Sequence, residues 1–311
     1  MKICLITGGT GMVGNAIKQI AHLYSYKFIF LSSKDCDLTD YQLTYAKFNS
    51  IKPNFVIHLA ANVGGLYKNI NKKIEMFEVN MLININVLKV CHELSVEKVI
   101  SCLSTCIFPD KTTYPINETM LHNGPPHDSN DAYAYAKRML DIQSKAYHKT
   151  GKQFSCVIPT NIYGEHDNYS LTNGHVIPAL IHRCYICKQN KEPFVVKGSG
   201  KPLRQFIYSK DLAELIMWSL QNYNEYEPII LSVCKEDEVS IKDVAKIIAK
   251  EFNYEEALEF DISHSDGQFK KTADNSKLIN LIGDYKFTSI NEGIKNSVKW
   301  FINNYEICRK N

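Results

Sequence analysis

The sequence of 311 residues lacks several features that would define a protein class at once. Its formal net charge is only +3 and it has no long basic run, which argues against a nucleic-acid-binding protein. No apolar stretch approaches the ~20 residues that a membrane-spanning helix needs. We find no internal repeat and no low-complexity tract. These absences leave an ordinary globular chain, long enough for one large domain or for one large and one small domain.

The ten cysteines lack the compact spacing of a disulfide framework in a small secreted domain. They are scattered, and several lie within apolar segments, as reduced core residues do. Cys184 and Cys187 have the C-x-x-C spacing, but no second Cys/His pair lies nearby, so we expect no metal site. Because an apolar strand pattern follows Met1 directly, we expect no cleaved signal peptide and a cytoplasmic protein.

An apolar run at residues 2–7 predicts a buried parallel strand. It leads directly into the glycine-rich segment 8–14 (GGTGMVG) and then into a helical pattern at 15–24. Glycines at a spacing of three permit a tight turn, a close approach of pyrophosphate to the backbone and close helix packing. The N-terminus of the helix then presents N–H groups and a positive dipole end to an anion. The sequence therefore predicts a dinucleotide site.

The end of the second expected strand, residues 27–31, bears on the choice of dinucleotide. An NAD site normally has an acidic residue here for the ribose hydroxyls. This chain has Ser32, Ser33 and Lys34 instead, and two hydroxyls with a cation suit a 2′-phosphate. Asp35 follows the lysine, where it is less well placed for the ribose. We therefore expect NADPH/NADP rather than NAD.

Strand and helix patterns alternate along the first half of the chain, and this simple alternation decays after about residue 165. The pattern predicts an α/β fold, a Rossmann doubly wound parallel sheet with a smaller α/β substrate-binding lobe. We expect residues 1–165 and interleaved parts of roughly 205–235 in an NADP-binding domain, and residues 166–204 and 236–311 in the substrate-binding lobe. Further strands are expected at 54–60, 98–103, 154–159 and 229–233, and helices at 74–93, 133–148, 176–187, 240–252 and 290–305.

Tyr133 and Lys137 lie four residues apart at the start of one expected helix, and therefore on one face of it. A free tyrosine hydroxyl has a pKa near ~10 and is a poor acid or base at neutral pH. An ammonium beside it favours the phenolate and lowers that pKa. Tyr135 is only two residues from the lysine and faces elsewhere. Alone, this spacing is more typical of a surface pair, but the dinucleotide signature favours a catalytic pair.

Polar side chains also follow the expected strand 98–103, namely Ser104 and Cys106. In open parallel sheets the chemistry gathers at the carboxyl ends of the strands, so this hydroxyl and this thiol are suitably placed. His58 differs, because it lies inside an apolar run and is more typical of a hydrogen-bonded core histidine.

These motifs together resemble the extended short-chain dehydrogenases/reductases. The glycine-rich segment after Thr7, the hydroxyl of Ser104 and the pair Tyr133 and Lys137 carry that resemblance. Within this superfamily the chain is similar to the GDP-L-fucose synthases, over nearly its whole length. The narrower resemblance rests on residues 61–65, 104–109, 159–168, 174–178, 198–204 and 265–271.

The resemblance implies that GDP-4-keto-6-deoxy-D-mannose is epimerised at sugar carbons 3 and 5 and then reduced at carbon 4 by NADPH. Cys106 would be the base, and His175 would return a proton from the opposite face. Ser104 and Tyr133 would hold the carbonyl oxygen. Tyr133 would then protonate the alkoxide, while Lys137 tunes Tyr133 and holds the nicotinamide ribose. Alternatively, Cys106 is one more buried thiol and His175 only caps the following helix.

The resemblance also implies binding residues. Arg183, Arg204 and Lys271 would meet the GDP pyrophosphate, where a guanidinium binds two oxygens at once, although each could be a solvated surface charge. Asp266 would accept a hydrogen bond from the sugar or the guanine. The expected substrate-binding set is Asn161, Arg183, Lys197, Arg204, Asp266 and Lys271. The expected cofactor-binding set is Gly8, Gly9, Thr10, Gly11, Met12, Val13, Gly14, Ser33, Lys34, Ala60, Leu103, Lys137, Pro159, Asn161, Ile162 and His175.

Two positions depart from the family pattern. Many bacterial relatives have an arginine in place of Thr10 and a tryptophan in place of Lys197. Thr10 weakens an extra contact with the 2′-phosphate and leaves that contact to Lys34 and the serines. Lys197 removes an aromatic surface from the nucleotide pocket. Both departures concern contacts rather than the reaction.

Other functions of the same fold remain open. A nucleotide-sugar 4-epimerase or 4,6-dehydratase would retain NAD, but a dehydratase needs a carboxylate pair just after Ser104 and a 4-epimerase has no use for Cys106 and His175. A non-catalytic NADP sensor commonly loses the tyrosine or lysine, and both are present. The resemblance implies a homodimer through a four-helix contact. Its apolar surface is expected from Met81, Leu82, Ile85, Leu88, Met139 and Leu140, although these residues could simply face the sheet.

Overall fold

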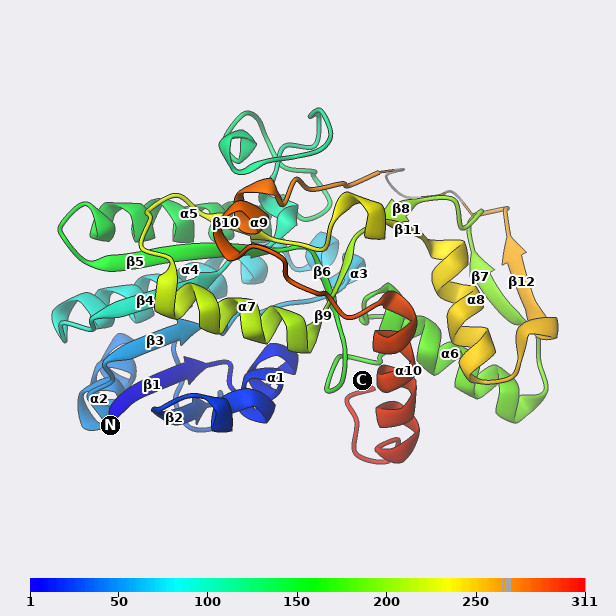
Figure 1. Cartoon of the computed structure of the whole chain (residues 1–311), viewed down its shortest axis with the longest axis horizontal. Helices are drawn as coiled ribbons and strands as arrows, with labels where there is room; N and C mark the ends of the chain where they lie inside the picture. Colours follow the sequence, from blue (N-terminus) through cyan, green and yellow to red (C-terminus); the bar gives the residue numbers. More distant parts are fainter. Residues whose placement is uncertain (265, 267–269, 311) are drawn as a thin grey trace. The chain divides into compact units, whose positions relative to one another are not determined.

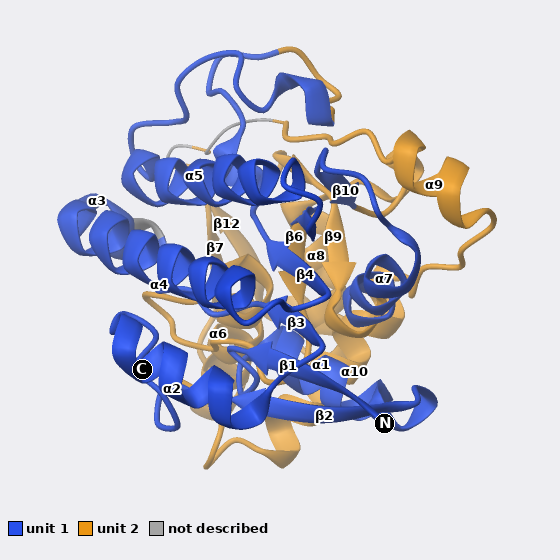
Figure 2. Ribbon diagram, turned by 90° about the vertical axis from the view of Figure 1, so that its left-hand side faces the viewer, with its two compact units in different colours: residues 1–112, 118–159, 212–231 blue, residues 113–117, 160–211, 232–311 orange. Residues whose placement is uncertain are grey.

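The structure is a computed structural model that describes residues 1–264, 266 and 270–310. The chain forms two compact units, coloured separately in Figure 2. Unit 1 comprises Met1–Thr112, Glu118–Pro159 and Leu212–Leu231, and unit 2 comprises Thr113–Asn117, Thr160–Asp211 and Ser232–Asn311.

These units differ from the expected domain boundaries at residues 113–117, 160–165, 205–211 and 232–235, which all belong to unit 2. The main reason is a strand pair. Strand β6 (Asn161–Tyr163) pairs in parallel with β9 (Phe206–Tyr208), and their ladder hydrogen bonds hold both strands in one unit. No local sequence pattern predicts a pairing between segments that lie 45 residues apart.

Unit 1 is built on a six-stranded sheet in the order β10-β5-β4-β3-β1-β2, and each neighbouring pair is parallel (Figure 1). The chain moves from β1 outward to β2, then returns past β1 to β3 and continues in the opposite direction. That reversal makes a doubly wound sheet and confirms the expected fold class. The strands are β1 (Lys2–Thr7), β2 (Tyr26–Leu31), β3 (Phe55–His58), β4 (Lys98–Cys102), β5 (Gln153–Pro159) and β10 (Ile229–Leu231).

Helices cover both faces of this sheet, which is why its strands are continuous apolar runs. Figure 2 shows α4 and α5 together along one face with α2 beside α4, and α1 and α7 along the other. The helices are α1 (Met12–Ile20), α2 (Tyr41–Ile51), α3 (Leu66–Asn71), α4 (Lys73–Glu93), α5 (Asp131–His148) and α7 (Ser209–Asn222), of which α7 begins in unit 2.

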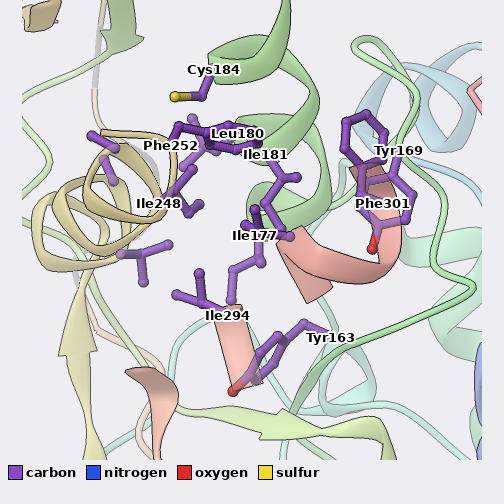
Figure 3. Packing of buried hydrophobic residues seen from close by; sticks show 14 of the residues in the cluster. Tyr163, Tyr169, Ile177, Leu180, Ile181, Cys184, Ile248, Phe252, Ile294 and Phe301 are labelled. Carbon is purple, nitrogen blue, oxygen red and sulfur yellow. The ribbon is translucent and has the colours of Figure 1, made fainter. Parts of the chain in front are cut away.

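Unit 2 packs helices against short strand pairs around its own apolar core. Figure 3 shows this core, in which Ile177 and Ile181 meet Ile248, Ile294 and Phe301. The helices at 241–251 and 290–303 are amphipathic and contribute one apolar face each, and the helix at 176–190 adds Ile177, Leu180, Ile181 and Cys184. The helices are α6 (Val176–Asn190), α8 (Ile241–Glu251), α9 (Ser276–Ile282) and α10 (Ile290–Asn303), and the remaining strands are β7 (Phe194–Lys197), β8 (Leu203–Arg204), β11 (Val239–Ser240) and β12 (Leu258–Asp261).

The structure also bears on membrane insertion and on the state of the cysteines. Within the described part of the chain, no helix combines the length and apolarity that a bilayer crossing requires. All ten cysteines are free of disulfides, as the scattered spacing predicts. Cys184 belongs to the apolar core of unit 2.

A buried chain of hydrogen bonds links the first strand of unit 1 to helix α5. The Nδ1 atom of His58 lies 2.8 Å from the Thr7 hydroxyl, and its Nε2 atom lies 3.1 Å from the side-chain oxygen of Asn84. Asn84 also donates to the carbonyl of Ala136 on α5 at 3.3 Å. His58 is fully buried. It is therefore a satisfied core histidine, as expected, and it helps to set the distance between sheet and helix.

Burial gives His58 a defined pH signature. Desolvation, followed by the charge of Lys137, lowers its pKa from 6.5 to about 3. Because the folded pKa lies below the unfolded one, the stabilisation is complete above pH ~6.5 and is lost as the pH falls towards 3. Between pH 6.5 and 5.5 we expect this residue alone to reduce the free energy of unfolding by about 1 kcal/mol.

Urea unfolding of the wild type and of His58→Gln at several pH values measures this effect. The variant should show a shallower loss of stability on acidification, and the exposed His22→Gln should retain the wild-type slope. Equal slopes for all three proteins would contradict a neutral buried imidazole at position 58.

Candidate active site

The glycine-rich segment forms a tight turn between the carboxyl end of β1 and helix α1. Gly8 has a φ of +67°, a conformation that side chains rarely adopt, and a Cβ there would lie 2.8 Å from the Ala60 nitrogen. A Cβ on Gly14 would lie 2.6 Å from the carbonyl carbon of Gly9. The turn is therefore closed against β3 on one side and against its own helix on the other.

Helix α1 begins with its N–H groups available. Gly11 is the N-cap, and no side chain caps the helix. The first N–H groups of a helix have no intrahelical partner, so those of Met12, Val13 and Gly14 can bind an anion. Thr10, at the tip of the turn, is exposed. This geometry fits the pyrophosphate of a dinucleotide.

In the segment after β2 the acidic side chain is hydrogen-bonded within the turn, whereas the basic side chain is exposed. Asp35 accepts hydrogen bonds from the main-chain N–H of Ser32 at 2.8 Å and from its hydroxyl at 2.5 Å. These bonds lower the pKa of Asp35 and commit its carboxylate to the turn. Ser33 and Lys34 remain exposed. The chain therefore offers a hydroxyl and a cation here, a chemistry that suits a 2′-phosphate better than ribose hydroxyls.

The carboxyl end of β4 leads into a single 3-10 turn, η2 (Thr105–Ile107), which carries the expected base. Ser104 is the N-cap of this turn, and its Oγ accepts from the Cys106 N–H at 3.4 Å. Both side chains are partly buried. Leu103, just before them, is anchored by its N–H to the Val157 carbonyl at 2.8 Å. The strand end thus holds a hydroxyl and a thiol two residues apart in a fixed turn.

Helix α5 brings the tyrosine and the lysine to this place. The ammonium of Lys137 donates to the carbonyl of Cys102 at 2.8 Å and lies 5.9 Å from the centroid of the Tyr133 ring. Charge on Cys106 acts on both Tyr133 and Lys137. The structure therefore brings Ser104, Cys106, Tyr133 and Lys137 together within unit 1, as the sequence predicts.

The pKa of Tyr133 moves in the opposite direction to the one expected. Burial, with smaller effects of charge on Cys106 and Cys102, raises it well above 10. Burial also lowers the pKa of Lys137. The Lys137 ammonium, which donates to the Cys102 carbonyl, does not offset the desolvation of Tyr133. At neutral pH Tyr133 is consequently a neutral phenol, the form that donates a proton.

Two further expected cofactor residues lie at strand ends in unit 1. Ala60 follows β3, and its N–H donates to the Thr7 hydroxyl at 3.2 Å. Pro159 is the last residue of β5. Both therefore lie at the carboxyl edge of the sheet, where dinucleotides bind in such folds.

His175 is the N-cap residue of α6 in unit 2, but its side chain makes no capping hydrogen bond. The simple capping explanation for this histidine is therefore wrong. Although the residue as a whole is exposed, the protein around its imidazole, and then the charge of Arg309, lower its pKa. Asn161 and Ile162 lie on β6, where the Asn161 amide donates to the Gln205 carbonyl at 2.9 Å.

The expected substrate-binding cations lie on different elements of unit 2. Arg183 on α6 donates to the Val195 carbonyl on β7 at 3.4 Å, and Lys197 at the end of β7 is exposed. Arg204 on β8 donates to the Leu203 carbonyl at 2.7 Å. Its pKa is lowered by burial, an effect that Tyr114 and Glu238 oppose.

The last expected binding motif is described only in part. Ser265 and residues 267–269 lie outside the described residues. Asp266 accepts from the Ser199 N–H at 2.8 Å and from its hydroxyl at 2.5 Å, so its carboxylate already closes the turn after β7. Lys271 is half-buried.

Sequence reasoning missed the groups that support these residues from distant parts of the chain. Tyr114 and Glu238 act on Arg204. The buried amide of Gln205 bonds the Val233 carbonyl at 3.0 Å and the main chain of Ala273. No local motif identifies them. Gln205 itself lies between β8 and β9.

Comparison with known proteins places this geometry in context. The sequence pattern of the NAD dependent epimerase/dehydratase family matches residues 4–234. GDP-L-fucose synthase of Dictyostelium discoideum is 54% identical over 313 residues, covering 99% of this chain and 98% of the relative. Probable GDP-L-fucose synthase of Drosophila melanogaster is 52% identical over 321 residues, covering 100% of both chains.

A solved structure has a closely similar fold. The crystal structure of a GDP-L-fucose synthetase from Naegleria fowleri bound to NADP superposes with a TM-score of 0.96 at 48% identity. The match covers 99% of this chain and 95% of that one.

Proposed function

Since the chain belongs to the NAD dependent epimerase/dehydratase family, we propose that it catalyses the GDP-L-fucose synthase reaction with NADPH. GDP-4-keto-6-deoxy-D-mannose is epimerised at carbons 3 and 5 and then reduced at carbon 4. The observation that carries this proposal is the gathering of Ser104, Cys106, Tyr133 and Lys137 at the end of β4. The full-length similarity to proteins of that name supports it.

The residues present fit the cofactor. The turn closed by Gly8 and Gly14 and the uncapped start of α1 suit a pyrophosphate, and the exposed Ser33 and Lys34 suit a 2′-phosphate. Ala60, Leu103 and Pro159 line the strand ends beside them. We further assign Asn161, Ile162 and His175 to the nicotinamide end, on the family resemblance.

For the epimerisation we assign the base to Cys106. Protons on the carbons beside a ketone are acidic, because the enolate places its charge on oxygen. The Cys106 sulfur takes such a proton, and His175 returns one from the opposite face. The lowered pKa of His175 makes its imidazolium a stronger acid and a less populated one at pH 7, so the ring takes up a proton from water before it gives one to the sugar. The hydroxyls of Ser104 and Tyr133 stabilise the enolate oxygen.

For the reduction we assign the proton donor to Tyr133. When bound, NADPH supplies the hydride that carbon 4 receives. The neutral phenol protonates the resulting alkoxide, and Lys137 then offers its positive charge to the phenolate. The hydrogen bond from Lys137 to the Cys102 carbonyl holds that charge in position.

For the GDP moiety we assign Arg183, Lys197, Arg204 and Lys271 as cations and Asn161 as a hydrogen-bonding residue. Asp266 can still accept from the substrate, because its carboxylate has about four lone-pair sites and the bonds to Ser199 use only some of them. This set carries four positive charges, which suit the negative charge of a pyrophosphate.

We also propose a cytoplasmic homodimer. Apolar side chains remain exposed on the neighbouring helices α4 and α5, including Leu82, Ile85 and Met139. Leu88 and Leu140 are fully buried, so they face the core and not a partner, which corrects part of the expected surface. Ile74, Phe77 and Ile142 are exposed in addition.

The reaction is tested by incubation with GDP-4-keto-6-deoxymannose and NADPH, followed by NMR of the sugar product. We expect GDP-L-fucose. Tyr133→Phe should lower the rate of NADPH oxidation by about 10²–10⁴-fold, because it removes the proton donor. Cys106→Ser should abolish inversion at carbons 3 and 5. Tyr135→Phe, on the other side of the same helix, should remain within about twofold of wild type. A product with unchanged carbons 3 and 5 in the wild type would refute the proposal.

The cofactor assignment predicts a selective loss. Lys34→Ala should raise the KM for NADPH by about tenfold or more, because a charge-assisted hydrogen bond to phosphate is lost. The KM for NADH should stay unchanged. Lys27→Ala, an exposed cation at the far end of β2, is the control and should affect neither. Equal losses for both cofactors would assign Lys34 a structural role instead.

The dimer is tested by size-exclusion chromatography with light scattering. The wild type should show twice the mass of the 35.5 kDa chain at micromolar concentration. Leu82→Glu should give a monomer, since it places a charge in the apolar contact, whereas Leu23→Glu on an unrelated exposed turn should not. A monomeric wild type would exclude the dimer.

A further inference from the structure

Arg138 lies beside the turn that carries Cys106. It follows Lys137 on α5, and its Nε atom donates to the carbonyl of Ile107 at 2.6 Å. Ile107 is the last residue of the turn η2, so this bond ties the guanidinium to the peptide that follows Ile107, one residue beyond Cys106. The helix and the turn are in contact within unit 1.

The guanidinium is buried without full pairing. Arg138 is only 5% exposed, and its Nη2 atom is buried with no hydrogen-bond partner. Among the described residues, no carboxylate forms an ion pair with it. The ring of Tyr135 lies 5.5 Å from its Cζ atom and covers part of it. A buried guanidinium donor without a partner is costly, by about 1–3 kcal/mol or more, so its retention needs a compensating role.

The two lysines of the same helix, Lys145 and Lys137, both have hydrogen-bond partners for their ammonium groups. Lys145 donates to the carboxylate of Asp141 at 2.8 Å and forms an ion pair with it. Lys137 donates to a carbonyl. Arg138 differs because one of its nitrogens satisfies the turn and another remains unpaired.

Two acidic groups, Tyr135 and Cys106, lie close enough to Arg138 for their charge to act on it. Burial lowers the pKa of Arg138, and charge on Tyr135 and on Cys106 opposes that effect. The titratable groups that face Cys106 from α5 are Tyr133, Lys137 and Arg138. On β4, burial raises the pKa of Cys102, and the charge of Lys137 opposes that rise. Two of these groups are cations when protonated, and burial lowers the pKa of both.

We propose that Arg138 is a positioning residue that stabilises Cys106 as a thiolate and fixes the turn from which Cys106 acts. This role rests on the proposed function, because it makes Cys106 the base of the epimerisation. The thiolate takes the proton from carbon 3 or 5, and the electron pair of that C–H bond moves onto the carbonyl oxygen. Cys106 then becomes a neutral thiol, and the loss of its proton to water restores the thiolate beside Arg138.

The assignment also explains why arginine suits this position. A guanidinium stays protonated in a partly dry site, whereas a lysine ammonium loses its proton more readily when buried. Its planar fork holds the Ile107 carbonyl with one nitrogen, and its delocalised charge still acts on Cys106. An apolar side chain would fill the volume but would supply neither interaction.

The pH dependence of Cys106 alkylation by iodoacetamide tests the role without substrate. Fragment mass spectrometry must locate the label, because Cys102 lies on the same tryptic peptide. In the wild type, the midpoint for Cys106 should lie below the ordinary thiol value of ~8.5. Arg138→Gln should raise that midpoint by about one pH unit and slow alkylation at pH 7 by about tenfold. Arg138→Lys should lie between these two, and Lys145→Gln should match the wild type.

Two results would overturn the role. One is a wild-type midpoint at or above ~8.5, which needs no variant and therefore holds even if Arg138→Gln fails to fold. The other is a folded Arg138→Gln protein with the wild-type profile. Failure of the proposed function has a different signature, namely a wild type that does not exchange the protons at carbons 3 and 5. If the proposed function and the role of Arg138 both hold, proton exchange in Arg138→Gln should fall at pH 7 and recover towards pH 9.

Discussion

The hydrogen bond from the Lys137 ammonium to the Cys102 carbonyl is the interaction on which the site depends. It joins helix α5 to the carboxyl end of β4, and it lies in a place where Lys137 is only 2% exposed. Tyr133 lies one turn earlier on that helix, and Ser104 and Cys106 follow directly after that strand. Because one buried bond fixes both elements, the hydroxyls, the thiol and the ammonium keep a common geometry that no single element could supply.

The buried chain through Thr7, His58 and Asn84 reinforces that geometry from the other side. It begins at the end of β1, next to the glycine turn, and ends at the carbonyl of Ala136 on α5. Buried hydrogen bonds therefore link the dinucleotide turn to the catalytic helix through an otherwise apolar interior. The low pKa of His58 keeps that link neutral, so His58 adds no positive charge beside Lys137.

Sequence reasoning recovered the parts of this protein whose causes are local. Apolar runs gave the strands of unit 1, glycine spacing gave the turn before α1, and the four-residue spacing of Tyr133 and Lys137 gave their shared helix face. It failed where burial or distant pairing decides. Desolvation reverses the expected pKa direction of Tyr133, the β6 and β9 pair moves the domain boundary, and Leu88 and Leu140 turn out to be core residues. The partner of the Ile107 carbonyl, Arg138, lies 31 residues away and had no local signal.

The central claim is that the cluster at the end of β4 performs proton abstraction as well as reduction. The most direct measurement is incubation of the wild-type protein with GDP-4-keto-6-deoxymannose in D2O without NADPH, followed by NMR of the sugar. The account predicts deuterium at carbons 3 and 5 before any reduction takes place. If NADPH is consumed when added but no deuterium enters either carbon, the protein is a simple 4-ketoreductase. Cys106 and its neighbour Arg138 would then be packing residues.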